Sequence, residues 1–179
     1  MEVLLQRHFF SLLQFRDNMN IPSNKTENFR VASNGNTTNL FSTKGFQIMD
    51  NSEREYNEHK AFWKNAKGDV LITGLGIGFS HCNLVNNPNI TSVTIIEKYQ
   101  DVIDLVWDHC SKDDRFNLIH ADANTWEIEG YWDCIWIDHW VLNISEDTID
   151  DFIKSMTTKY SPHCSWLGFW LKERDKHEK

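Results

Sequence analysis

Three glycines at alternate positions follow directly on a short apolar run. The run is residues 70–72, and the glycines are Gly74, Gly76 and Gly78. An apolar run bounded by glycines is typical of a buried strand, and the residues after Gly78 are typical of a helix start. Glycine lets the backbone turn sharply and come close to a ligand where a Cβ would intrude. Strand, glycine turn and helix predict the first half of a βαβ unit that binds a nucleoside.

An acid lies where the second half of such a unit needs one. Glu97 ends the β-rich run at residues 92–96 and follows Gly78 by about 20 residues, which is the spacing of the acid that binds the ribose hydroxyls. Glycine turns also serve packing alone. The prediction therefore depends on the turn, the strand and the acid together.

Two further acids follow predicted strands. Asp122 comes after residues 117–120, and Asp138 ends the run at residues 131–137. The carboxyl ends of parallel strands meet at one edge of a sheet, and ligands bind there. One such acid alone is more often a solvated loop residue or a helix cap. We expect Glu97, Asp122 and Asp138 on one rim, and this shared placement indicates a site.

Helical patterns separate the predicted strands, at residues 52–66, 101–110 and 146–160. Ser52 suits the N-cap of the first helix, with Glu53 and Glu55 in a first turn where the helix dipole favours acids. Strands that alternate with helices predict an α/β fold, a Rossmann-like parallel sheet with helices on both faces. The chain has room for five parallel strands, or for these and one more, so we expect a sheet shortened at the C-terminus. Residues 166–174 fit either a last strand or a short helix.

The first 51 residues have a different pattern. Apolar residues at helical spacing predict a short helix within residues 3–17, and glycine turns at residues 34–36 and 43–45 separate short β-like runs. We expect an N-terminal helix and β-hairpin appendage over residues 1–51. The Rossmann-like nucleoside-binding core would then cover residues 52–179.

Composition limits the partners. The net charge of −8 argues against nucleic acid, because phosphates require a basic surface. The four cysteines lack metal-ligand spacing, so we expect no metal site and an intracellular chain with reduced thiols. We find no signal peptide and no run of transmembrane length, which predicts a cytoplasmic protein without membrane contact. The eight Trp and eleven Phe exceed what one small pocket would use. They predict a homo-oligomer, through the hairpin region or residues 166–170.

The motif of residues 70–78 with Glu97 resembles the cofactor motif of class I S-adenosylmethionine-dependent methyltransferases. The chain is most similar to the spermidine synthase-like branch, in which a β-hairpin domain precedes the core. In that branch a Gln is followed nine positions on by Tyr-x-Glu, as Gln47, Tyr56 and Glu58 are here. Residues 57–78 also resemble short methyltransferase-like proteins of bacteriophages. The resemblance covers roughly residues 40–140.

The resemblance implies S-adenosylmethionine as the cofactor and gives six residues a place around it. They are Gly74, Gly76 and Gly78 around the methionine part, Glu97 on the ribose, Asp122 beside the adenine amino group, and Gln47 on the hairpin side.

It also implies that Asp138 faces the sulfonium and the acceptor, where it could accept a proton from an amine or hydroxyl. Tyr56 is the second candidate catalytic residue. The resemblance implies that it closes the pocket from the hairpin side, and shaping the pocket is a commoner role for such a residue than proton transfer. His139 is an alternative base, although a packing or hydrogen-bonding role is commoner for such a histidine.

Three functions remain open. The first is a methyltransferase acting on a small molecule or another acceptor. The second is a spermidine synthase-like aminopropyltransferase, but the acid that holds the donor's free amine in that family is replaced by Ile77. The third is a non-catalytic protein that binds S-adenosylmethionine or another nucleoside.

Overall fold

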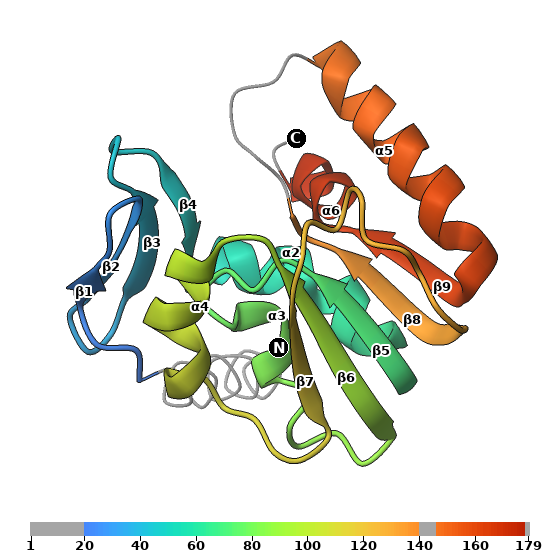
Figure 1. Ribbon diagram of the computed structural model, residues 1–179, viewed down its shortest axis with the longest axis horizontal. Helices are drawn as coiled ribbons and strands as arrows, with labels where there is room; N and C mark the ends of the chain where they lie inside the picture. The colour runs from blue at the N-terminus through green and yellow to red at the C-terminus, as the bar shows by residue number, and fades with distance from the viewer. Residues whose placement is uncertain (1–19, 140–145, 178–179) are drawn as a thin grey trace, which may run out of the picture.

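The central sheet has five parallel strands in the order β7-β6-β5-β8-β9 (Figure 1). The computed structural model describes residues 20–139 and 146–177, so the helix expected in residues 3–17 lies outside the described residues. The five strands are β5 (Gly68–Thr73), β6 (Ile90–Glu97), β7 (Phe116–His120), β8 (Trp132–Ile137) and β9 (Cys164–Phe169). The chain adds β6 and β7 on one side of β5 and then returns to its other side. Such a switch point opens a crevice at the carboxyl ends of the strands.

Helices cover both faces of this sheet, which confirms the predicted fold class. The helices are α2 (Glu53–Asn65), α3 (Phe79–Cys82), α4 (Gln100–Val106), α5 (Glu146–Tyr160) and α6 (Trp170–His177), with 3-10 turns at Trp107–His109 and Ser161–His163. On one face, Met156 and Tyr160 of α5 join the cluster that holds Leu71 and Ile135. On the other face, residues of α2, α4 and α6 pack on the opposite side chains of β5, β6 and β8. In the described part of the chain, no helix is both long and apolar enough to cross a membrane.

The ambiguous stretch at residues 166–174 holds both elements. Strand β9 ends at Phe169, and α6 begins at Trp170. Trp166 stacks on Trp136 with 6.3 Å between ring centroids, and the side chains of Phe169 and Trp170 are buried in the core. Much of this aromatic run therefore belongs to the chain's own core rather than to a surface for a second copy. A homo-oligomer remains a prediction.

A second, antiparallel sheet precedes the core. Its strands are β1 (Asn24–Lys25), β2 (Phe29–Ser33), β3 (Thr38–Ser42) and β4 (Gln47–Asp50), in that order. The hairpin predicted around residues 43–45 is present as β3–β4, but it belongs to a four-stranded sheet. Asn28 joins this sheet to α4, because its backbone N–H and its side-chain amide both donate to Asp101 Oδ2, at 3.1 and 2.8 Å. The division of the chain at residues 51 and 52 stays a prediction.

Helix α2 turns an unusual face to the core. Ser52 is its N-cap, with Oγ accepting from the Glu55 N–H at 3.3 Å, as the sequence predicts. Glu55, His59 and Phe62 recur at helical spacing, and all three are buried. Phe62 stacks on Trp136 of β8 at 5.1 Å, and the other two side chains are ionisable. Packing of α2 on the sheet therefore brings an acid and an imidazole inside the molecule.

We predict that Phe62→Ala lowers the free energy of unfolding by about 3–5 kcal/mol, because it leaves a cavity against Trp136. Urea denaturation monitored by fluorescence measures the loss. The control is Phe46→Ala, whose side chain is 50% exposed and should change stability by less than about 0.5 kcal/mol. Equal effects of the two substitutions would show that α2 does not pack as described.

Candidate functional site

A cavity of about 640 Å³ lies between the small sheet and the carboxyl ends of the parallel strands. Glu97, Asp122 and Asp138 all line it, together with Gly74 and Gly76 of the glycine turn. The structure thus brings together the three rim acids and two of the three glycines that the sequence singles out. The volume lies within the range of about 300–1,000 Å³ that is usual for small-molecule sites.

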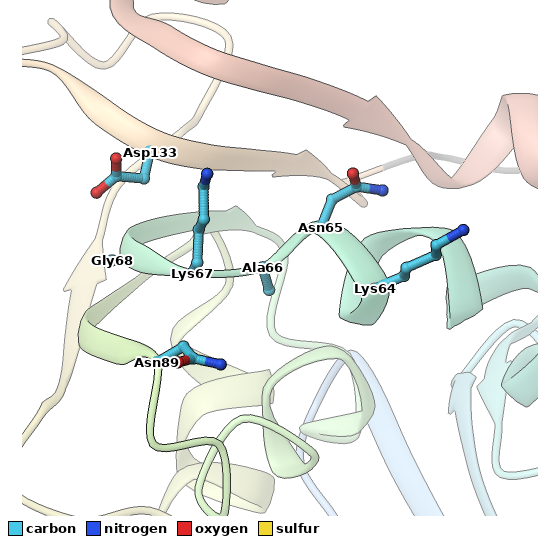
Figure 2. A pocket seen from close by; sticks show the side chains of 7 residues that line it. All are labelled: Lys64, Asn65, Ala66, Lys67, Gly68, Asn89 and Asp133. Atoms are coloured by element: carbon cyan, nitrogen blue, oxygen red, sulfur yellow. The ribbon is translucent and has the colours of Figure 1, made fainter.

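A second hollow, of about 510 Å³, lies at the opposite end of β5 (Figure 2). Its lining residues are Lys64, Asn65, Ala66, Lys67, Gly68, Asn89 and Asp133. Here Asp133 Oδ2 accepts from the Asp69 N–H at 2.9 Å, which secures the start of the strand. Ligands of open α/β sheets bind at the carboxyl ends of the strands, so the first cavity is the candidate site.

Glu97 connects three segments at the floor of this cavity. Its Oε2 accepts from the Leu75 N–H of the glycine turn, and its Oε1 accepts from the Tyr99 N–H that begins α4, both at 2.8 Å. The residue is 6% exposed, and burial raises its pKa above the ordinary value although both amides lower it. Each carboxylate oxygen keeps a lone pair that can accept from a ligand hydroxyl.

The glycine turn touches two other parts of the chain. A Cβ on Gly74 would lie 2.8 Å from the Asp138 carbonyl oxygen, and one on Gly76 would lie 2.4 Å from Met49 Sδ. Both residues have positive φ, so side chains are excluded on two grounds. Gly78 does not line the cavity, and a Cβ there would meet Cys110. The structure thus places Gly78 in packing contacts behind the turn.

Met49 of β4 lies on the turn from the other side. Its sulfur accepts from the Ile77 N–H at 3.5 Å, and the residue is 8% exposed. A thioether is a weak acceptor, so a ligand carboxylate could replace it on this amide. The Ile77 side chain is fully buried in the core and does not line the cavity.

Asp122 lies in a tight turn after β7, and its side chain is partly exposed. Lys98 Nζ lies 2.8 Å from its Oδ2, and the Asn124 backbone and side-chain amides donate to its Oδ1 at 3.0 and 2.8 Å. The hydrogen bond from Lys98, with those from Asn124, lowers the pKa of Asp122 to about 2. A full negative charge therefore stands on this side of the cavity at neutral pH.

Asp138 lies at the other side, immediately after β8. Its Oδ2 accepts from the Ser80 hydroxyl at 2.5 Å and lies 3.1 Å from His59 Nε2. The side chain is only 4% exposed. Asp138 therefore lines the cavity, and the Ser80 hydroxyl and the His59 ring fix the position of its carboxyl group.

Glu55 and His59 extend this polar group into α2. His59 Nδ1 lies 2.9 Å from the Glu55 carbonyl oxygen, and Trp170 Nε1 donates to Glu55 Oε2 at 2.9 Å. Burial raises the pKa of Glu55 to about 8. Burial lowers the pKa of His59, but the charge and hydrogen bond of Asp138, with the contribution of Glu55, raise it by more.

Glu55 and His59 were not predicted from the sequence as residues of the site. It assigned Glu55 to a favourable place in the helix dipole, whereas the residue is 2% exposed and lines the cavity. The available signal was the spacing of Glu55, His59 and Phe62, which places two ionisable residues on an apolar helix face. Trp170 and Met49 also line the cavity, and only the folded structure brings them there.

Two residues named by the resemblance do not line the cavity. Gln47 is exposed, and its amide donates to Asp50 Oδ2 at 2.7 Å. Tyr56 is 9% exposed and packs on Trp63 with 5.2 Å between ring centroids. Strand β4 instead presents Ile48 and Met49 to the cavity. The roles implied for Gln47 and Tyr56 thus have no counterpart in the cavity wall.

His139 does line the cavity. Its Nδ1 lies 2.6 Å from Thr73 Oγ1, and its ring meets Phe152 edge-on at 5.3 Å. Burial lowers the pKa of His139 to about 4, so the ring is neutral at physiological pH.

Comparison with known proteins gives a likeness in fold only. No family model matches the chain, and no curated protein matches it. Among solved structures, it is similar to a DhpI–SAH complex, with 20% identity and a TM-score of 0.44 over 63% of this chain and 54% of that chain. It is also similar to spermidine synthase from Thermotoga maritima, with 19% identity and a TM-score of 0.49 over 66% and 47% of the two chains. The methyltransferase domain of bacterial CtHen1-CN gives 16% identity and a TM-score of 0.46, over 60% of each chain. The chain thus spans about half of the length of the first two structures.

The raised pKa of Glu55 predicts a pH effect on stability. Below pH 4.5 the acid is protonated in both states, whereas between 4.5 and about 8 only the folded state holds the proton. Stability is therefore lost as pH rises through this window. Against Glu55→Gln, which cannot titrate, the wild type should lose free energy of unfolding between about pH 5 and 8. Urea denaturation across this range tests the sign, and parallel curves would contradict it.

Proposed function

We propose that the cavity binds S-adenosylmethionine and that the chain is a methyltransferase acting on a small molecule. The observation that carries the proposal is the Glu97 carboxylate at the end of β6. It accepts from the glycine turn after β5 and lines the same cavity as Gly74 and Gly76. This is the arrangement that a nucleoside site requires, with ribose hydroxyls on the acid and the rest of the ligand along the turn.

The proposed cofactor accounts for the rest of the rim. Its adenine would lie toward Asp122, and its methionine part along the turn, where Met49 now occupies the Ile77 N–H. The sulfonium would then come near Asp138. Methyl transfer requires the nucleophile, methyl and sulfur to be aligned with water excluded, and the apolar walls from Ile48 and Trp170 suit that requirement. Asp138 would accept the proton that an amine or hydroxyl acceptor loses.

The chief alternative is aminopropyl transfer, and a non-catalytic nucleoside-binding protein is the other. Aminopropyl transfer uses a donor without a carboxylate and needs an acid for its free amine. The corresponding position is Ile77, whose side chain is buried in the core. The single experiment that separates the three is mass spectrometry of the products formed with candidate acceptors from S-adenosylmethionine and, in parallel, from its decarboxylated form.

The first prediction of this proposal concerns binding. Isothermal titration should show heat with S-adenosylmethionine, and Glu97→Ala should weaken binding at least about tenfold, since each charge-assisted hydrogen bond contributes about 1.5–3 kcal/mol. Glu129→Ala, at an exposed acid, is the control. Thermal unfolding of both variants shows whether the loss comes from misfolding. Wild-type protein that gives no heat with adenosyl-sulfur compounds at millimolar concentration would refute the proposal.

The second prediction concerns donor choice. The intact cofactor has a carboxylate that can take the Ile77 N–H from Met49, and the decarboxylated form has none. We expect the wild type to bind S-adenosylmethionine about tenfold more tightly, a difference of about 1.4 kcal/mol. Competitive titration of the two compounds measures this ratio. A preference for the decarboxylated donor, with spermidine formed from putrescine, would favour aminopropyl transfer instead.

A further inference from the structure

The contacts among His59, Ser80 and Asp138 require one more hydrogen than a neutral His59, a Ser80 hydroxyl and an ionised Asp138 supply. His59 Nδ1 lies 2.9 Å from the Glu55 carbonyl oxygen, which can only accept, so Nδ1 carries a hydrogen. Ser80 has one hydroxyl hydrogen, which can go to Asp138 Oδ2 at 2.5 Å or to His59 Nε2 at 3.1 Å. If it goes to Oδ2, the 3.1 Å contact between Nε2 and Oδ2 needs a second hydrogen, and if it goes to Nε2, the short contact between Ser80 Oγ and Oδ2 needs one. Either the ring is an imidazolium or Asp138 is a carboxylic acid.

Glu55 is the second proton holder in the group. Its Oε2 accepts from Trp170 Nε1 and lies 3.6 Å from His59 Nδ1. Burial raises the pKa of its carboxyl to about 8, which His59 opposes and the negative charges of Asp138 and Glu58 increase, so the protonated form of Glu55 is favoured.

Other charged and titratable groups lie near these three residues. Glu58 of α2 is fully buried, and its Oε1 lies 4.0 Å from Nε of Arg54 on the same helix. His139, the residue after Asp138, is neutral because burial lowers its pKa to about 4. Lys98 lines the cavity but pairs with Asp122. Among the ion pairs of the described residues, His59 is the one cationic partner of Glu55 and Asp138.

We infer that Glu55, His59 and Asp138 form one proton-holding cluster at the inner end of the cavity, and that it releases a proton when a sulfonium enters. The inference rests on the proposed function, because the sulfonium is that of S-adenosylmethionine. Gly74 abuts Asp138, so a methionine part along the turn brings its sulfur to the same end of the cavity. The positive charge favours ionised carboxyls. The O–H bond of Glu55 breaks, its electrons stay on the carboxylate, and the proton passes to the buffer.

The cluster would then distinguish the cofactor from its product by charge. S-adenosylmethionine carries the sulfonium, whereas the thioether left after transfer, S-adenosylhomocysteine, is neutral. A carboxylate formed for the first ligand receives no counter-charge from the second. Glu55 and His59 are thus positioning residues, which act on the ligand through charge and through Asp138.

Isothermal titration in two buffers of different ionisation enthalpy tests this, near pH 7 and below the pKa of about 8 for Glu55. The enthalpy difference gives the number of protons released. We expect up to about one more proton with S-adenosylmethionine than with S-adenosylhomocysteine. Protons from the amino group that both ligands share cancel in this comparison. Glu55→Gln, which keeps an acceptor for Trp170, should abolish the difference, and Glu53→Gln in the same helix turn should leave it.

The outcomes separate the two proposals. Binding of both ligands with equal proton release overturns the cluster's role and leaves the cofactor assignment standing. No binding of either ligand overturns both. The wild-type comparison needs no variant, so it decides even if Glu55→Gln fails to fold. Nitrogen-15 spectra of labelled histidine give a second measurement, in which His59 Nδ1 must be protonated, and an unprotonated Nδ1 would contradict the proton count.

Discussion

The candidate site depends on one buried carboxylate. Glu97 accepts from Leu75 in the turn after β5 and from Tyr99 at the start of α4, each at 2.8 Å. Neighbouring parallel strands would otherwise end in independent loops. A buried acceptor that satisfies both amides holds these loops at one separation, and losing it would leave the buried Leu75 N–H unsatisfied. The cavity floor, the course of the glycine turn and the start of α4 all follow from this contact.

Charge around the cavity is arranged in two different ways. Asp122 faces Lys98 near the surface, and its pKa falls to about 2. Asp138 and Glu55 are buried against one histidine, and burial raises the pKa of Glu55 to about 8. A carboxyl is thus a full anion at Asp122, whereas burial favours the protonated form of the carboxyl at Glu55. The difference comes from solvent exposure and partners rather than from sequence position.

Much of the core could be predicted from the sequence, because its signals are local. Apolar runs, the Ser52 cap and the glycine turn each depend on a few adjacent residues, and strand ends in a parallel sheet place Glu97, Asp122 and Asp138 on one rim without further information. Burial of Glu55 and His59 could not be predicted from local signals. It arises because α6 and β8 cover that face of α2, and the contacting residues of these elements lie more than 70 residues after Glu55 and His59 in the sequence. The positions of Gln47 and Tyr56 outside the cavity wall likewise depend on how the small sheet and α2 pack on the core.

The small sheet is part of the site rather than an appendage to it. Met49 reaches the glycine turn, and Phe46 and Ile48 form the wall opposite the strand ends. The sheet is held there by Asn28 on Asp101 and by Phe29 on Tyr99, whose rings lie 5.0 Å apart. Tyr99 is also held by Glu97, because its backbone N–H donates to Glu97 Oε1 at 2.8 Å. Docking of the sheet and the shape of the cavity floor are therefore coupled through one turn, so a ligand that displaces Met49 acts on both.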